Sequence, residues 1–169
     1  NNDNPTTLTL VKTLVNDNGG TNIIADWALT ADGNPFTSGV SQNVTPDTYT
    51  LTESGPSGYT ASAWVCVGGS QTGSDITLAL GENATCTITN DDTSATLTLQ
   101  KTVVNDNGGS ATNANFTPSI DGSPTTWSTA INLPPGAPTA SETALAGYTA
   151  GSWGGDCAAD GSITLTLGQ

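Results

Sequence analysis

The two lysines of this sequence occupy the same place in a segment that occurs twice, and both should point into a protein core. Thr7–Gly20 reads TLTLVKTLVNDNGG, and Thr96–Gly109 reads TLTLQKTVVNDNGG. Because side chains alternate between the two faces of a strand, Lys12 shares a face with its leucine neighbours, as Lys101 does. A lone buried ammonium is costly unless it is paired, neutralised or consumed. The sequence must therefore supply a partner for each lysine.

The repeat extends over two homologous units. Lys12 and Lys101 are 89 residues apart, and the same offset relates several other residues. The matched pairs are Trp27 and Phe116, Asp32-Gly33 and Asp121-Gly122, Glu53 and Glu142, Tyr59 and Tyr148, and Trp64 and Trp153. We expect one domain over residues 7–91 and a second over residues 96–169. Residues 1–6 are then a linker from a preceding unit, and residues 92–95 are the linker between the two.

The second unit should lack its last strand. Its Leu167-Gly168-Gln169 matches Leu80-Gly81-Glu82, after which the first unit continues with NATCTITN. The offset of 89 residues maps Asn90 onto Asn1, so the chain is expected to begin where a preceding unit ends. We expect the missing strand to come from continuation of the chain in a longer array. The alternative is a strand donated by a neighbouring copy.

The three cysteines follow the same pattern. Cys66 and Cys86 lie in one unit and can pair, closing a loop of 20 residues. Such a loop contributes about 3 kcal/mol by chain entropy. Cys157 corresponds to Cys66, and its expected partner lies beyond residue 169, with a free thiol as the alternative.

The composition favours a secreted β-protein. Thr, Ser, Asn and Gly abound and no stretch has helical apolar spacing, so we expect an all-β fold with almost no helix. The net charge of −13, from 15 acidic and 2 basic residues, argues against nucleic acid and anionic membranes as partners. No apolar run approaches the roughly 18 residues that span a bilayer. Paired cysteines and few lysines favour an extracellular or cell-surface location.

The alternation brings a lysine, a glutamate and an asparagine into one core. In two later strands it predicts these inward sets: Tyr49, Leu51 and Glu53, and Ala84, Cys86, Ile88 and Asn90. Lys12 can then form an amide with the side-chain carbonyl of Asn90, with release of ammonia and Glu53 as the proton shuttle. Apolar surroundings favour a neutral amine and a protonated carboxyl group, and fixed positions supply a high effective concentration. The alternative is a simple ion pair, or a lysine that reaches the surface.

Three motifs resemble the Cna-B-type, SpaA-like domains of bacterial surface adhesins and pilins. They are TLTLVKT, YTLTESGPSGY and TCTITND, and the resemblance covers both units. It implies tandem β-sandwich domains with an Ig-like, prealbumin-like fold and an isopeptide bond from Lys12 to Asn90, with Glu53 as catalyst. In the second unit Glu142 matches the catalyst, but Pro138 and Ala140 replace the preceding Tyr and Leu. Its acceptor asparagine is absent, so we expect Lys101 to be unbonded unless a residue equivalent to Asn1 arrives from elsewhere.

Two further features have competing interpretations. The NDNGG segments favour a hairpin turn, because Asn-Gly is a strong hairpin signal. They could also bind calcium through Asp17 or Asp106, with the acidic linker residues Asp91 and Asp92 as further ligands, although the spacing is not that of an EF-hand. Most aromatic residues should fill cores, whereas Trp127 has no aligned aromatic and is expected to be exposed.

The sequence predicts a structural protein and no cofactor. It contains no histidine or arginine, and two of its three glutamates are repeat equivalents, so turnover of an external substrate is not expected. We predict a stalk module of an extracellular adhesin or fibre, with adjacent repeats or copies of itself as partners. The alternatives are a noncovalent filament assembled by strand donation, and a glycan- or ice-binding module motivated by its threonine-rich outward faces.

Overall fold

The computed structural model describes residues 3–169 and divides the chain between Thr93 and Ser94 into two compact units. Asn1, the predicted acceptor equivalent, lies outside the described residues. About 4% of the chain is helical, in the short 3₁₀ helices η1 (Ile24–Asp26) and η2 (Asn113–Asn115), and the remaining regular structure is β-strand. The prediction of an all-β fold is therefore confirmed.

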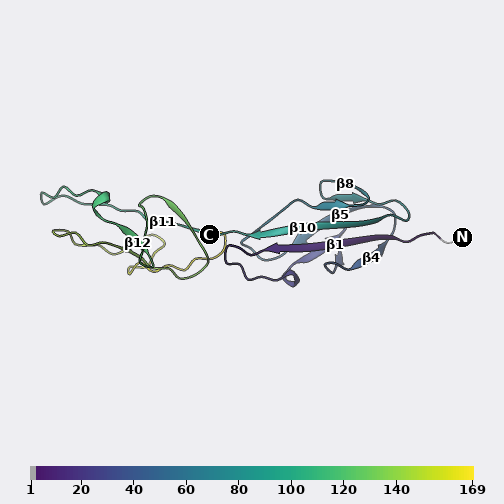
Figure 1. Cartoon of the computed structure of the whole chain (residues 1–169), viewed down its shortest axis with the longest axis horizontal. Coiled ribbons are helices and arrows are strands. Elements are labelled where there is room, and N and C mark those ends of the chain that lie inside the picture. The colour runs from purple at the N-terminus through teal and green to yellow at the C-terminus, as the bar shows by residue number, and fades with distance from the viewer. Residues whose placement is uncertain (1–2) are drawn as a thin grey trace. The chain divides into compact units, whose positions relative to one another are not determined.

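The first unit consists of two sheets. The first sheet has the order β4 (Ser41–Val44), β1 (Thr6–Val15), β10 (Asn83–Asp92) and β6 (Tyr59–Ala61), with β7 (Val65–Val67) also paired to β10. The second has the order β3 (Asn34–Phe36), β2 (Ala28–Ala31), β5 (Thr48–Ser54), β9 (Asp75–Thr77) and β8 (Ser70–Thr72). The first and last strands, β1 and β10, lie side by side and run parallel (Figure 1).

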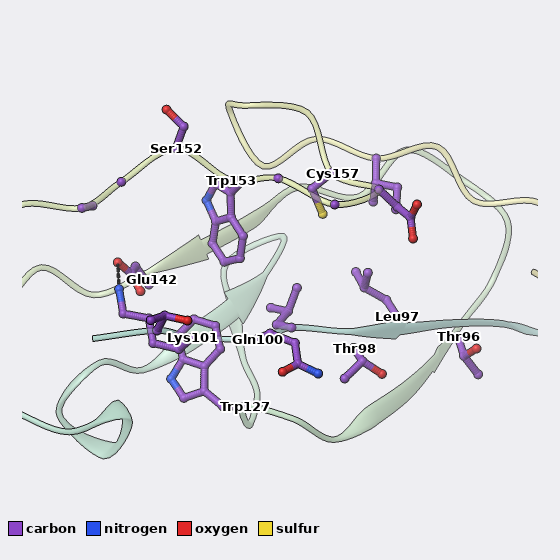
Figure 2. A pocket seen from close by; sticks show the side chains of 18 of the residues that line it. Thr96, Leu97, Thr98, Gln100, Lys101, Trp127, Glu142, Ser152, Trp153 and Cys157 are labelled. Atoms are coloured by element: carbon purple, nitrogen blue, oxygen red, sulfur yellow. Dashed lines mark hydrogen bonds and ion pairs between the residues drawn. The ribbon is translucent and has the colours of Figure 1, made fainter. Parts of the chain in front are cut away.

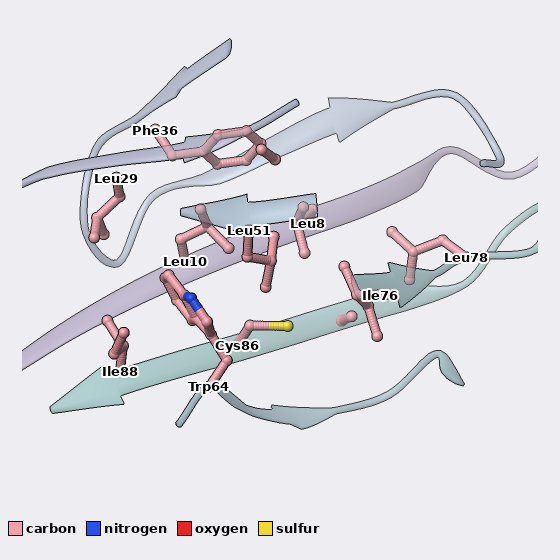
Figure 3. Close-up of a cluster of buried hydrophobic side chains, with 12 residues drawn as sticks. Leu8, Leu10, Leu29, Phe36, Leu51, Trp64, Ile76, Leu78, Cys86 and Ile88 are labelled. Atoms are coloured by element: carbon pink, nitrogen blue, oxygen red, sulfur yellow. The ribbon is translucent and has the colours of Figure 1, made fainter. Parts of the chain in front are cut away.

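Side chains from both sheets form the core of the first unit. Leu8 and Leu10 of β1 and Ile88 of β10 meet Leu51 of β5 and Ile76 of β9 (Figure 3). Along β10 every second side chain is buried, as the alternation predicted, because one face of the strand meets the opposite sheet and the other meets solvent. The two sheets therefore form the predicted β-sandwich.

The second unit repeats part of this architecture. Strand β11 (Ala95–Thr98) pairs with β14 (Ala130–Leu133), and β12 (Pro118–Ile120) lies between β13 (Ser123–Pro124) and β15 (Ala140–Glu142). Isolated bridges from Gly136 to Leu165 and from Thr139 to Ser162 stand where β5 and β9 pair in the first unit. Its core is smaller and contains Leu97, Leu99, Ile120, Ile163 and Leu165.

The last strand of the second unit is absent from residues 94–169, as predicted. Strand β1 continues to Val15 because β10 pairs with it along its whole length. Its counterpart β11 ends at Thr98, and within the described part of the chain only β14 pairs with it. One edge of β11, together with the segment that follows it, is therefore left open.

Two predictions about local structure are wrong. The segment Asn16–Gly20 turns the chain but forms no hairpin, because it leads through η1 to β2, which belongs to the opposite sheet. Trp127 is half-buried rather than exposed. Its Nε1 donates a hydrogen bond of 2.7 Å to the carbonyl oxygen of Phe116, and its ring stacks on Trp153 at a centroid distance of 6.2 Å.

Candidate crosslink site

Lys12 and Glu53 form an ion pair between the two sheets of the first unit. Lys12 lies in the middle of β1 with its side chain facing β5, and that side chain is 0% exposed. Its Nζ donates a hydrogen bond of 2.7 Å to Oε2 of Glu53, whose side chain is 11% exposed. The sequence prediction that Lys12 and Glu53 share the core is correct, and the lysine does not reach the surface.

Asn90 lies on the same inward face of the neighbouring strand. In the parallel register Lys12 is opposite Ile88, and Asn90 is opposite Leu14, which is the next inward position along. Diagonal neighbours of this kind have a separation of roughly 7–8 Å, within reach of a long side chain. Asn90 is 4% exposed, and its Oδ1 has no hydrogen-bond partner among the described residues. The fold thus brings the lysine, the glutamate and the amide into one buried region.

This arrangement contains the groups that amide formation requires. The amine is a nucleophile once its proton passes to the adjacent carboxylate, and the side-chain carbonyl of Asn90 is the electrophile. The buried, unsatisfied Oδ1 is costly in the unreacted state, because it has lost its hydrogen bonds to water without replacement. The side chains that such a reaction needs therefore lie in one region of the first unit.

An aromatic pair covers the lysine. Trp27 lies with its ring centroid 5.1 Å from Nζ of Lys12 and packs edge-on against Tyr59, also at 5.1 Å. The hydroxyl of Tyr59 donates to Oδ1 of Asn16 at 2.8 Å, which fixes the pair against the end of β1. A side chain at Gly55 would collide with the Trp27 ring. Sequence reasoning treated Trp27 as a core residue only; its repeat at Phe116 was the signal for a role beside the lysine.

The second unit reproduces this arrangement without an acceptor among its residues. Nζ of Lys101 donates to Oε1 of Glu142 at 2.6 Å, and the ring centroid of Phe116 lies 4.4 Å from Nζ. Phe116 packs edge-on against Tyr148, as Trp27 does against Tyr59. The side chains of Lys101 and Glu142 are 14% and 13% exposed. Lys101 is therefore less completely enclosed than Lys12.

The first unit contains the predicted disulfide. Cys66 on β7 and Cys86 on β10 are direct partners across antiparallel strands, with a Cα–Cα distance of 4.0 Å. Cys157, in the second unit, is a half-buried free thiol in the described chain. Burial, reinforced by the negative charge of Asp156, raises the pKa of the Cys157 thiol.

Asp92 acts mainly as an acceptor for the loop after β1. Its buried carboxylate accepts backbone N–H groups from Asp17 and Asn18, each at 2.9 Å, and from Gly20. Burial opposes ionisation most strongly, but the hydrogen bonds from Gly20, Asn18 and Asp17 together outweigh it and lower the pKa of Asp92. Oxygens of Asp17, Asp91 and Asp92 lie within 4.8 Å of one another.

Calcium binding at this cluster, and at the exposed Asp106 in the equivalent loop of the second unit, stays a prediction. The carboxylate of Asp92 already accepts three amide groups of the loop. The cluster is therefore explained as a structural contact between a loop and the end of β10.

Comparison with known proteins identifies the family. Neither a curated protein nor a solved structure matches this sequence. The family model for the SpaA_2 prealbumin-like fold domain matches twice, over residues 3–88 and 92–169. Domains of this kind are generally structural rather than enzymatic. Among the residues described, no helix has the length and apolar character needed to cross a membrane. The chain therefore belongs to the SpaA-like prealbumin-fold family and contains two of its domains in tandem.

Proposed function

We propose that this chain is part of the stalk of an extracellular bacterial fibre or adhesin, and that the first unit is closed by an amide bond between Lys12 and Asn90. Membership of the SpaA-like family supports a pilus or adhesin stalk module. In this role the protein spaces and anchors other parts of a surface structure, and its partners are adjacent repeats or copies of itself.

One observation carries the proposal. A fully enclosed lysine contacts a glutamate, while the side-chain oxygen of a neighbouring buried asparagine lacks any hydrogen bond among the described residues. An ion pair alone would explain Lys12 and Glu53 but would leave the burial of Asn90 Oδ1 unexplained. Amide formation explains the burial of all three side chains, Lys12, Glu53 and Asn90. The product has no ammonium, and a protonated Glu53 can donate a hydrogen bond to the new amide oxygen.

The reaction is balanced within the three side chains. Glu53 accepts a proton from Nζ of Lys12, and the neutral amine attacks Cγ of Asn90. The new Nζ–Cγ bond forms, and the Cγ–Nδ2 bond breaks. Glu53 gives its proton to the departing nitrogen and takes one from the attacking nitrogen, so the nitrogen leaves as neutral ammonia and Glu53 ends protonated. Ammonia is released. Close packing replaces the high reactant concentration that amide exchange needs in water.

The bond has a mechanical consequence that fits a stalk. Because β1 and β10 are parallel neighbours, the start of β1 and the end of β10 lie at opposite ends of the sheet. Tension applied at Thr6 and Asp92 therefore shears this pair of strands along its length. A covalent link between Lys12 and Asn90 transfers that tension directly from the first strand to the last.

Intact-mass measurement under reducing conditions tests the proposal. We expect the wild-type protein to weigh less than its sequence by the mass of one ammonia molecule. Lys12→Ala and Asn90→Ala should each have the full sequence mass, whereas Lys101→Ala, the matched change in the second unit, should keep the deficit. A wild-type protein with its full sequence mass would refute the crosslink.

A further inference from the structure

The second unit contains a groove where the first unit contains β10. The groove has a volume of about 780 Å³ and is lined by β11, by the segment that follows it, and by residues 150–157. Figure 2 shows Leu97, Lys101, Trp153 and Cys157 around this space, with Lys101 joined to Glu142 at one end. The lining is partly apolar, and its ion pair between Lys101 and Glu142 is the repeat equivalent of the pair between Lys12 and Glu53 in the first unit.

The hydrogen bonds at the mouth of the groove give the direction in which a strand would enter. In the first unit the amide of Thr7 donates to the carbonyl of Glu82 at 3.0 Å, and the next residue begins β10. In the second unit the amide of Thr96, the repeat equivalent of Thr7, donates to the carbonyl of Gln169 at 2.9 Å. In the first unit this bond comes directly before the backbone hydrogen bonds between β1 and β10. The second unit therefore already has the equivalent bond at the start of β11.

The first unit also gives the register of the missing partner. Strand β10 places Cys86 opposite Leu10, Ile88 opposite Lys12 and Asn90 opposite Leu14. At the offset of 89 residues the corresponding positions of the second unit are Leu99, Lys101 and Val103. A cysteine opposite Leu99 would meet Cys157, and an asparagine opposite Val103 would come within reach of Lys101, in the way that Asn90 does for Lys12.

We propose that this groove is a strand-acceptor site for an extended peptide with the residue chemistry of β10. The peptide lies parallel to β11 and presents a small residue, a cysteine, an apolar residue and an asparagine, at every second position, to the core. Backbone hydrogen bonds to the open edge supply binding, and the inward side chains supply specificity. When the peptide cysteine arrives as a mixed disulfide, the Cys157 thiolate attacks its sulfur and the original partner leaves as a thiolate, so a disulfide joins the peptide to Cys157. Only the further amide bond to Lys101 rests on the crosslinking chemistry proposed for the first unit.

A thiol-exchange experiment on the full chain tests the site. The probe is a synthetic peptide of residues 83–92, NATCTITNDD, carrying its cysteine as a mixed disulfide with thionitrobenzoate. The Cys157 thiolate attacks the peptide sulfur, and thionitrobenzoate leaves as a coloured thiolate, so the rate is read by absorbance and the adduct by mass. Burial of the thiol slows reaction with simple disulfides, whereas docking of the peptide holds the two sulfurs together.

The matched control is a peptide in which the cysteine and the following threonine exchange places. It has the same composition, but its cysteine lies on the opposite face from the alanine, isoleucine and asparagine. We expect the β10-type peptide to react at least about tenfold faster, the difference that roughly 1.4 kcal/mol of binding supplies. Cys157→Ser should abolish the adduct. Equal rates for the two peptides would overturn the proposal, because they would mean simple thiol reactivity.

A noncovalent measurement separates docking from the chemistry. A peptide with serine in place of cysteine should protect the backbone amides of residues 99–104 from hydrogen exchange, and absence of protection would overturn the site. In the disulfide adduct, loss of ammonia that disappears in Lys101→Ala would extend the amide chemistry to this unit. An adduct that keeps its ammonia still supports docking. A stable dimer of the chain that resists the peptide would assign the groove to a second copy and overturn the proposal.

Discussion

At the scale of single residues, the buried polar groups of the first unit differ in how fully their hydrogen-bonding capacity is used. Lys12 has a carboxylate partner and an aromatic ring beside it, whereas Oδ1 of Asn90 has no partner among residues 3–169. An unsatisfied buried polar group costs about 1–3 kcal/mol, and a buried ion pair brings little net stability. The unreacted site is therefore a poor way to stabilise a fold but a suitable arrangement for a reaction.

A change at Glu53 separates the contribution of this site to stability from its part in the proposed reaction. Glu53→Gln keeps the size of the side chain but removes the proton acceptor, so we expect the first unit to retain its ammonia for far longer than the wild type does. Compared with Asn90→Ala, which is also uncrosslinked but keeps the ion pair, Glu53→Gln should lose about 3–5 kcal/mol of unfolding free energy, because it has a buried ammonium without a carboxylate. Intact mass followed over time, together with urea denaturation, measures both effects.

The control for this change is Glu142→Gln in the second unit. It should leave the ammonia loss of the first unit intact and cost less stability, because the side chain of Lys101 is 14% exposed and remains partly hydrated. Complete ammonia loss in Glu53→Gln would mean that Glu53 is not the proton shuttle.

The residues of this site were largely predictable from the sequence, and their surroundings were not. Alternation has a period of two, so it placed Lys12, Glu53 and Asn90 inward without knowledge of which strands pair. The half-burial of Trp127 could not be anticipated, because its repeat equivalent is Ser38 and its contact with Trp153 depends on how distant segments pack. The hairpin expected at Asn18-Gly19 was displaced by a carboxylate more than seventy residues away.

At the scale of elements, the loop Asn16–Gly20 holds the end of β10 through the carboxylate of Asp92. The pKa of Asp92 is lowered from its ordinary value of 3.8 in the folded protein. A lowered pKa means that this contact contributes stability above the unfolded pKa and loses it as the pH falls through the folded one. We therefore expect the loop to stay attached until the pH falls below about 4, where an ordinary aspartate is already about half protonated.

Hydrogen exchange of the backbone amides of Asn18 and Gly20 measures this detachment. Their protection should fall with decreasing pH in the wild type and should be low at all pH values in Asp92→Asn. Asp91→Asn, the change at the exposed neighbouring position, should behave as the wild type does. Protection of Asn18 and Gly20 that is unchanged in Asp92→Asn would show that the carboxylate does not hold the loop.

The disulfide ties β7 to β10 in the same sheet. It closes a loop of 20 residues, and a loop of this length contributes about 3 kcal/mol by restricting the unfolded chain. We expect Cys66→Ala combined with Cys86→Ala to lower the unfolding free energy of the first unit by about this amount. The comparison is best made with Lys12→Ala present, so that the disulfide is the one covalent tie in that unit.

Urea denaturation of Lys12→Ala, with and without the two cysteine changes, gives the difference in unfolding free energy. Cys157→Ala is the control, because this thiol lies in the second unit and forms no bond within the described chain. A loss of stability that is equally large in Cys157→Ala would assign the effect to general packing rather than to the closed loop.

At the scale of the whole chain, the repeat predicted two domains of one family, and the two matches to the SpaA_2 prealbumin-like fold domain confirm this. The sequence also predicted which strand the second unit lacks, since the end of the second unit can be aligned with the residues that precede β10 in the first. It could not predict that β1 and β10 are parallel neighbours, because strand pairing depends on the whole sheet and not on local pattern. That pairing decides how the first unit responds to tension.

Force spectroscopy on the full chain under reducing conditions tests this response. In the wild type, the amide bond should let tension bypass residues 13–89, so the second unit should supply nearly all of the extension. Lys12→Ala should add the stretch from residue 12 to residue 90, about 270 Å for 78 residues at about 3.4 Å each. Lys101→Ala should match the wild type, since the second unit lacks an acceptor among the described residues. Equal extensions for the wild type and Lys12→Ala would mean that β1 and β10 are held by hydrogen bonds and packing alone, and that tension can separate them.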